Sequence, residues 1–145
     1  MPNKKYLAGR RFEYKIKEEL QKSGWYVIRS AGSKSLFDLI GIRARKINGE
    51  IGSFEYQIHI GFWQLKKNIS DNQALKILSD ILNTLFNTTL VGHLQVYSCK
   101  NFTELSKICY IGNERREKDS QQYIAISFGI IYTPPKKLTK RQSRI

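Results

Sequence analysis

Residues 29 to 42 read RSAGSKSLFDLIGI, an apolar segment interrupted by one acid, Asp38. Alternate side chains of a strand share a face, so Asp38 is expected on the same side as Ile40. Phe37 and Leu39 are then expected on the opposite face. A buried carboxylate is costly unless it is paired, hydrogen-bonded or bound to a metal. The segment therefore predicts a buried strand whose acid needs a partner.

Upstream of this strand, residues 4 to 22 predict an α-helix. Phe12, Ile16 and Leu20 recur four positions apart, which is the spacing of one helix face, and Gly24 follows the last turn as a stop signal. Between this helix and the opening segment, WYVIRS is rich in aromatic and β-branched residues and predicts a strand. We expect the small residues that follow it to form a turn.

Downstream, Asn48-Gly49 is a strong two-residue hairpin signal, and residues 54 to 67 predict the next strand. A second helix is expected within residues 68 to 86, with Ser70 or Asp71 as its N-cap. Its apolar positions, all expected to be buried, are 74, 75, 78, 81, 82, 85 and 86.

The C-terminal part predicts more sheet. Residues 92 to 100 and 121 to 132 are interpreted as strands, and residues 101 to 108 as a short helix or turn. The expected fold class is α/β, with a mixed β-sheet flanked by helices in one domain over residues 1 to 133. Residues 134 to 145 form a basic tail, expected to be flexible, which either contacts phosphate or is simply solvated.

The charge balance indicates a polyanionic partner. The chain holds 25 Lys and Arg against 12 Asp and Glu, a formal charge of +13. Nucleic acid is the leading candidate, and a generally basic surface is the alternative. The sequence has no apolar run of the ~20 residues that span a bilayer and no apolar core of a signal peptide, so we expect no membrane association and an intracellular, cytoplasmic location.

A disulfide framework or a zinc site is not expected. The two cysteines, Cys99 and Cys109, are too few for such a framework, and only His59 and His93 could join them at a zinc ion.

Three segments bring polar groups toward one edge of the predicted sheet. In FWQLKK, strand alternation places Gln64 and Lys66 on one face. Trp63 and Leu65 then lie on the other face. On the first helix, Glu13 falls on the apolar face.

Each of these polar residues also has a simpler explanation. Asp38 can pair with Lys66 or Arg29, and Glu13 with Lys17 one turn on. Together, however, two acids and an amide oxygen suit Mg²⁺ or Mn²⁺, and a neighbouring lysine can orient a water or stabilise charge on a phosphate. This combination is typical of metal-dependent phosphodiester hydrolysis.

The sequence resembles the archaeal Holliday junction resolvases of the PD-(D/E)XK nuclease superfamily. The resemblance covers about residues 6 to 100 and is carried by GRRFEYKIKEELQKSGWYVIRSAGSKSLFDLIGI followed by FWQLKK. It implies a restriction-endonuclease-like fold and a homodimeric, Mg²⁺-dependent DNA endonuclease, with Mn²⁺ as substitute, that cuts four-way junctions. The apolar segments after residue 90 are expected to form either the dimer interface or ordinary core.

The resemblance also assigns roles to individual residues. Glu13 matches the acid of the first helix, Asp38 the metal-binding aspartate and Lys66 the catalytic lysine, while Ser30 and Ser33 match a loop near the scissile phosphate. The implied catalytic set is Glu13, Asp38, Gln64, Lys66 and Ser33, and the implied metal ligands are Asp38, Gln64 and Glu13. The expected DNA contacts are Arg10, Arg11, Arg29, Ser30, Lys34 and Lys67.

Two positions depart from the superfamily pattern. Phe37 replaces the proline, a common change, and Gln64 replaces the usual glutamate, which puts metal affinity in doubt. Alternative functions are therefore a nuclease of the same fold acting on single strands, flaps or nicks, a DNA-binding module without chemistry, and a basic structural protein with a chance match.

Overall fold

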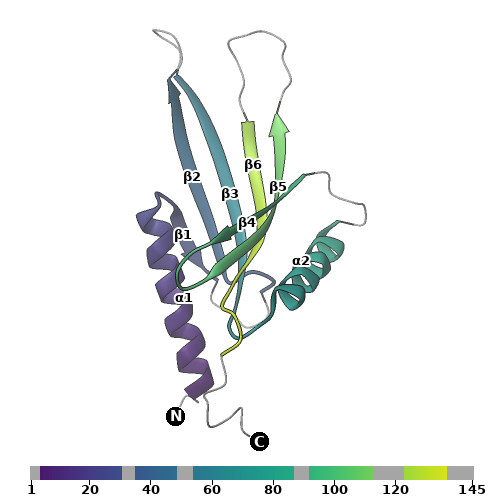
Figure 1. The fold of residues 1–145 in the computed structure, drawn as a ribbon. Coiled ribbons are helices and arrows are strands. Elements are labelled where there is room, and N and C mark those ends of the chain that lie inside the picture. The colour runs from purple at the N-terminus through teal and green to yellow at the C-terminus, as the bar shows by residue number, and fades with distance from the viewer. Residues whose placement is uncertain (1–3, 31–34, 49–53, 87–91, 113–122, 137–145) are drawn as a thin grey trace, which may run out of the picture.

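The computed structural model of the chain describes residues 4–30, 35–48, 54–86, 92–112 and 123–136. The described elements are, in chain order, α1 (Lys4–Lys22), β1 (Tyr26–Arg29), β2 (Leu39–Asn48), β3 (Phe54–Lys66), α2 (Asp71–Leu85), β4 (His93–Ser98), β5 (Thr103–Gly112) and β6 (Tyr123–Tyr132). The strands form one sheet in the order β1-β2-β3-β6-β5-β4 (Figure 1). Only β3 and β6 are parallel among these neighbours. The predicted mixed α/β class is therefore confirmed.

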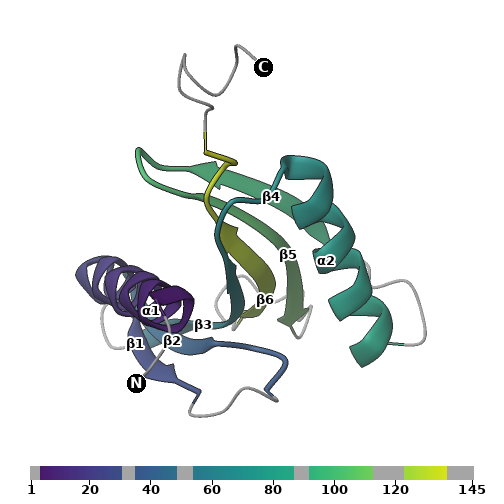
Figure 2. The ribbon, with the colours of Figure 1, turned by 90° about the horizontal axis from the view of Figure 1, so that it is seen from below.

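The two helices pack on opposite faces of the sheet. The helix α1 contacts β1 and β3, whereas α2 contacts β6 and β5 (Figure 2). Neighbouring positions of β6 show this division, because Ile131 belongs to the core beneath α1 and Ile130 to the core beneath α2. A strand covered on both faces buries successive residues, which explains why β6 is mostly apolar.

The first helix has the predicted bounds and the predicted buried face. Phe12, Ile16 and Leu20 are all buried, and Ile16 is 0% exposed. Replacing a fully buried isoleucine with alanine typically costs about 2–5 kcal/mol of stability. The stop at Gly24 is also confirmed, since this residue has a φ of 92°, which glycine adopts readily and other residues avoid. The chain can then turn into β1.

The second helix is capped by Ser70. Its hydroxyl accepts a hydrogen bond from the Gln73 backbone N–H, and the Gln73 side chain accepts one from the Ser70 N–H, so two otherwise unpaired donors are satisfied. Leu75 and Leu85 are exposed, so the expectation that they are buried was wrong. A helix lying on a sheet buries only the stripe that faces it. The buried positions of α2 are Ala74, Leu78 and Ile81.

The strand predicted through Asp38 begins later than expected. Asp38 lies at a bend, and β2 starts at Leu39. Leu39 pairs with Arg29, the last residue of β1. Across this bend the expected alternation fails, because Leu39 packs beneath α1 whereas Phe37 packs against the core beneath α2. Asp38 is therefore a half-buried residue at the start of a strand, not an interruption within one.

The segment predicted as a short helix or turn is also different. Residues 103 to 108 belong to β5, which pairs with both β4 and β6. Leu105, Ile108 and Cys109 are all buried, and this spacing of three and four positions imitates a helix face. The imitation arises because a central strand can be covered on both faces and then loses its alternation.

The two apolar segments after residue 90 differ in burial. Six consecutive residues of β6, Ser127 to Tyr132, are buried. All six residues of the edge strand β4 are exposed, including Leu94 and Val96.

The hairpin joining β2 to β3 is confirmed by their antiparallel pairing, but residues 49–53, and with them the predicted turn, lie outside the described residues. Within the described part of the chain, neither helix has the length and apolar character needed to cross a bilayer.

Candidate active site

A cleft of about 650 Å³ opens where β1 and β3 end and β2 begins. Its lining includes Glu13 from α1, Asp38 from the bend before β2, and Gln64 and Lys66 from the last three residues of β3. These four residues are the ones that the sequence analysis placed at one sheet edge. The fold therefore brings them together from three segments that are distant in sequence.

Asp38 is held firmly by backbone hydrogen bonds. Its own N–H donates to the Trp63 carbonyl at 2.9 Å, and its carbonyl accepts from the Ser30 N–H at 2.9 Å. Its side-chain Oδ2 accepts from the Leu65 N–H at 2.7 Å. These three bonds join the start of β2 to both neighbouring strands, so the Asp38 carboxylate has a fixed position in the cleft.

The surroundings of Asp38 disfavour its charge. Burial raises the pKa of the Asp38 carboxyl above its usual value, and the like charge of Glu13 raises it further. The Leu65 hydrogen bond and the charges of Lys66 and Arg29 act in the opposite direction and do not cancel the increase. A cation placed in the cleft would relieve this cost.

Glu13 forms an ion pair with Arg29, whose Nε lies 2.6 Å from Glu13 Oε2. Lys17 was the simpler partner expected from the sequence, but Glu13 pairs with Arg29 instead. The Arg29 guanidinium also lies over the ring of Tyr14, 5.3 Å from its centroid. One carboxylate oxygen of Glu13 is therefore engaged by a cation, which leaves Oε1 as its available ligand atom.

The oxygen donors of the cleft suit a hard divalent cation, but few of them are charged. Asp38 and Glu13 contribute carboxylate oxygens and Gln64 an amide oxygen, which are groups that Mg²⁺ and Mn²⁺ accept. Among the described residues, no three His, Cys, Asp or Glu side chains cluster closely enough to hold a metal ion. A cation in this cleft would therefore depend on the Gln64 amide and on water for its remaining ligands.

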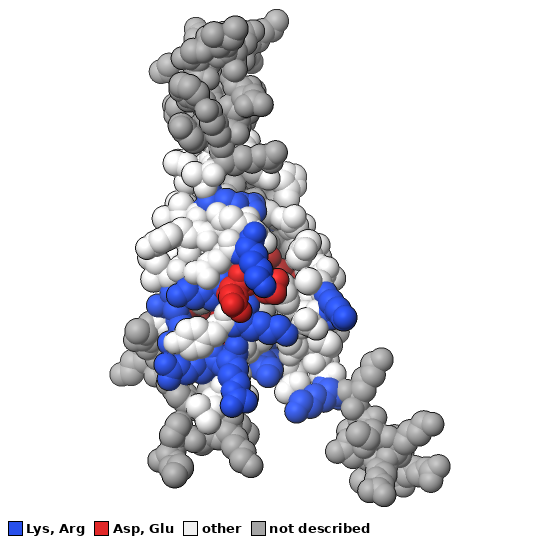
Figure 3. All heavy atoms as spheres, turned by 90° about the vertical axis from the view of Figure 1, so that its left-hand side faces the viewer, with Lys and Arg blue, Asp and Glu red and all other residues white. Residues whose placement is uncertain are grey.

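The predicted DNA contacts are distributed around the cleft. Lys67 lines it directly, and Arg11 lines an adjoining hollow that shares Lys67. Arg10 lies against Tyr14, with its guanidinium 5.6 Å from the ring centroid. In Figure 3, Lys and Arg side chains surround a small group of Asp and Glu on the face that carries α1. Ser33 and Lys34 lie outside the described residues.

Three features of the cleft were missed by the sequence analysis. Lys136, placed only in a basic tail, lines the cleft, as does Asn68. Gly9 lines it from α1, and a Cβ added there would meet nothing within 4 Å. The tail's charge was a signal for Lys136, but sequence alone did not show that the chain returns to β3.

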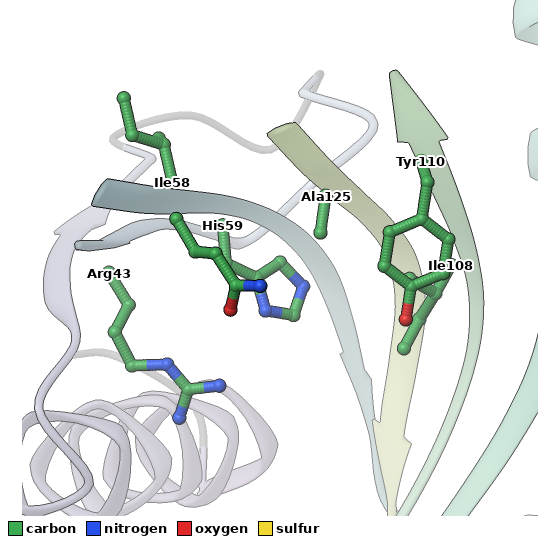
Figure 4. A pocket seen from close by; sticks show the side chains of 7 residues that line it. Arg43, Ile58, His59, Ile108, Tyr110 and Ala125 are labelled. Carbon is green, nitrogen blue, oxygen red and sulfur yellow. The ribbon is translucent and has the colours of Figure 1, made fainter. Parts of the chain in front are cut away.

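Another hollow, of about 390 Å³, lies farther along the sheet (Figure 4). Arg43 lines it from β2, and Ile58 and His59 line it from the neighbouring strand β3. His59 shares a hydrogen bond with the Ser127 hydroxyl. Burial, assisted by the charge of Arg43, lowers the pKa of His59 to about 4, so its imidazole is neutral at pH 7.

No protein-family model matches the chain, and no similar curated protein or solved structure was found.

Proposed function

We propose that the chain is a metal-dependent endodeoxyribonuclease with a restriction-endonuclease-like fold, and that it cuts branched DNA such as Holliday junctions. The single observation that carries this proposal is the cleft shared by Glu13, Asp38, Gln64 and Lys66. The formal charge of +13 supports a polyanionic substrate. The order of elements, a helix, three strands, a second helix and further strands, agrees with the proposed fold.

The residues of the cleft have distinct roles in this proposal. Asp38, Gln64 and the free oxygen of Glu13 would hold one Mg²⁺, with Mn²⁺ as substitute. The cation would supply Lewis-acid stabilisation of the phosphate and make a water molecule more acidic. Lys66 would orient that water or balance charge on the phosphate. Hydrolysis transfers a water oxygen to phosphorus and breaks one backbone P–O bond, which leaves a phosphate end and a hydroxyl end.

Arg29 would contribute by holding Glu13. The positive charge of Arg29 offsets part of the repulsion between Glu13 and Asp38. Arg29 is half-buried, so it can present charge to a phosphate at the mouth of the cleft as well. In this proposal it positions a ligand and binds DNA but does not act on the scissile bond.

The sparse charge of the ligand set favours one alternative, a DNA-binding module without chemistry. Only two carboxylates line the described part of the cleft, and Glu13 is already paired with Arg29. Such a module would bind DNA through the same cations but would not need a metal. A nuclease of the same fold that acts on single strands, flaps or nicks is the other alternative, because the ligand set is the same for each substrate.

The proposal is tested by cleavage of matched substrates. Four-way junction, flap, nicked duplex, plain duplex and single-stranded DNA of shared sequence are incubated with Mg²⁺, with Mn²⁺ and with EDTA. We expect the junction to be cut fastest, and only when metal is present. Binding without cleavage in either metal would favour the non-catalytic module, and faster cleavage of another substrate would replace the junction assignment.

The proposal also includes a homodimer, since two equivalent strands of a junction would be cut by two equivalent sites. Among the described side chains, the edge strand β4 exposes more large apolar ones than any other strand, namely Leu94, Val96 and Tyr97. Analytical ultracentrifugation of the wild type and of Val96→Lys tests this assembly. A wild-type chain that sediments as a monomer at micromolar concentration would contradict it.

A further inference from the structure

The chain returns to the candidate cleft after β6, and it is anchored there by Thr133. The Thr133 N–H donates to the Lys66 carbonyl at 3.1 Å, and its carbonyl accepts from the Ile69 N–H at 3.1 Å. Its hydroxyl accepts from the Asn68 N–H at 3.0 Å. These bonds tie the end of β6 to the segment that follows Lys66, so the start of the C-terminal tail has a defined place beside the cleft.

The next two residues are Pro134 and Pro135, which stiffen the path of the chain. A proline ring fixes φ near −65° and has no N–H to donate, and it also disfavours the helical conformation in the residue before it. Both prolines are exposed. A rigid, extended pair directly after an anchored threonine limits the positions open to the residue that follows, and that residue is Lys136.

Lys136 lines the same cleft as Asp38 and Lys66. The cations that lower the pKa of Asp38 are Lys66 and Arg29, so those two residues balance the acid. Lys136 is exposed and adds charge where a substrate would enter. A solvated lysine needs no anchor of this kind, whereas a phosphate-binding lysine benefits from a fixed position, because less freedom is lost when it binds.

Space along α1 agrees with an extended substrate. Ala8 and Gly9 line the cleft from α1, and a Cβ at Gly9 would meet nothing within 4 Å. Because these two side chains are small, α1 protrudes little into the cleft beside Glu13 and Asp38. A nucleic-acid backbone therefore has room to pass along α1 and to meet Lys136 in the same cleft.

We propose that Lys136 binds a backbone phosphate of the nucleic acid in this cleft, and that Thr133 positions it. This inference rests on the proposed function for the identity of the substrate. It extends that function by assigning a substrate-binding residue from the C-terminal segment, which no part of the superfamily resemblance covers.

Binding measured without metal provides the test. Affinity for a DNA four-way junction is determined in EDTA over a range of salt for the wild type, Lys136→Gln, Lys136→Arg and the control Lys76→Gln, whose lysine is exposed on α2. Loss of one phosphate contact lowers the slope of log affinity against log salt by about 0.7–0.9. We expect this decrease for Lys136→Gln, little change for Lys136→Arg, and none for Lys76→Gln.

A scan with the substrate locates the contact. Single methylphosphonates, which are neutral, replace the phosphates of the junction one at a time. At the phosphate bound by Lys136, the wild type and Lys136→Gln should bind equally, because the interaction has already been removed. Thr133→Val, which lacks the hydroxyl that accepts from Asn68, should weaken binding at the same phosphate.

The outcomes separate this inference from the proposed function. Equal salt slopes for Lys136→Gln and Lys76→Gln would overturn the role of Lys136 and leave nuclease activity untouched. A wild-type chain that binds DNA but never cleaves it would overturn the nuclease proposal, while the lower slope of Lys136→Gln would still support the phosphate contact.

Discussion

The backbone N–H of Leu65 donates a 2.7 Å hydrogen bond to the Asp38 carboxylate. The bond links the bend before β2 to the last residues of β3, and it offers a structural reason for an acid at position 38. It does not account for the whole environment of Asp38, since burial still raises the pKa of this carboxyl. Separate variants are therefore needed to test the structural role of Asp38 and its proposed role as a metal ligand.

Asp38→Asn is expected to abolish cleavage and to retain DNA binding, because it removes the charge that would hold the metal and none of the cationic surface. The asparagine oxygen can still accept from Leu65. Asp38→Ala cannot, and it should cost about 1–3 kcal/mol by leaving the Leu65 N–H unpaired. Cleavage assays, anisotropy and urea unfolding of both variants check this, and full cleavage by Asp38→Asn would remove Asp38 from the site.

The metal-free stability of Asp38→Asn should depend on pH. The folded-state pKa of Asp38 is raised, so the wild type loses stability as pH rises from the unfolded value of 3.8 through the folded value. Asparagine does not titrate and avoids this loss. The variant should therefore be the more stable protein at pH 7, with the advantage decreasing below the folded pKa, as measured by urea unfolding in EDTA. A wild type more stable than the variant at pH 7 would indicate that attractive charges dominate.

Gln64→Glu is expected to bind Mg²⁺ and Mn²⁺ more tightly, because it exchanges a neutral amide for a carboxylate beside Asp38. Faster cleavage does not follow from tighter metal binding, since a new acid near Lys66 can pair with that lysine. Isothermal titration of the wild type, Gln64→Glu and Asp38→Asn measures the effect. Unchanged affinity in Gln64→Glu would mean that Gln64 is not a ligand, and the non-catalytic module would then be the better proposal.

Two glycine-to-alanine changes should have opposite effects on stability. A Cβ at Gly61 would overlap the ring of Trp63, which is 1% exposed and donates to Glu104, so Gly61→Ala should destabilise the fold by about 1–3 kcal/mol. At Gly9 the added methyl meets nothing, and alanine favours a helix, so a gain of about 0.5–1 kcal/mol is expected. Urea unfolding of the two variants measures both, and tolerance of Gly61→Ala would contradict the described packing.

His59 should titrate well below the usual histidine range. Its pKa is lowered from 6.5 to about 4, so its contribution to stability is complete above pH 6.5 and is lost as pH falls toward 4. NMR titration of the imidazole measures the pKa directly. Arg43→Gln should raise the pKa of His59 only part of the way toward 6.5, because burial is the larger cause of the decrease. The distant Arg11→Gln serves as control. A His59 pKa near 6.5 in the wild type would show that its ring is solvated.

Local patterns determined much of this fold from the sequence alone. The four-residue spacing of Phe12, Ile16 and Leu20 predicted α1 with its bounds, because one helix face is a property of neighbouring residues. Alternation likewise separated Trp63 and Leu65, which pack beneath α1, from Gln64. Position within the sheet was not available from such patterns, and β5 was misread because burial on both faces of a central strand removes its alternation.

Relations between distant residues were decided only by the tertiary structure. The bend at Asp38, its hydrogen bond from Leu65, the pairing of Glu13 with Arg29 and the place of Lys136 in the cleft each join segments that no local pattern connects. Sequence composition predicted that acids and cations would need partners, because unpaired buried charge is costly. Which partner each one received depends on strand register and on where the chain returns, and these follow from the packing of both helices against one sheet.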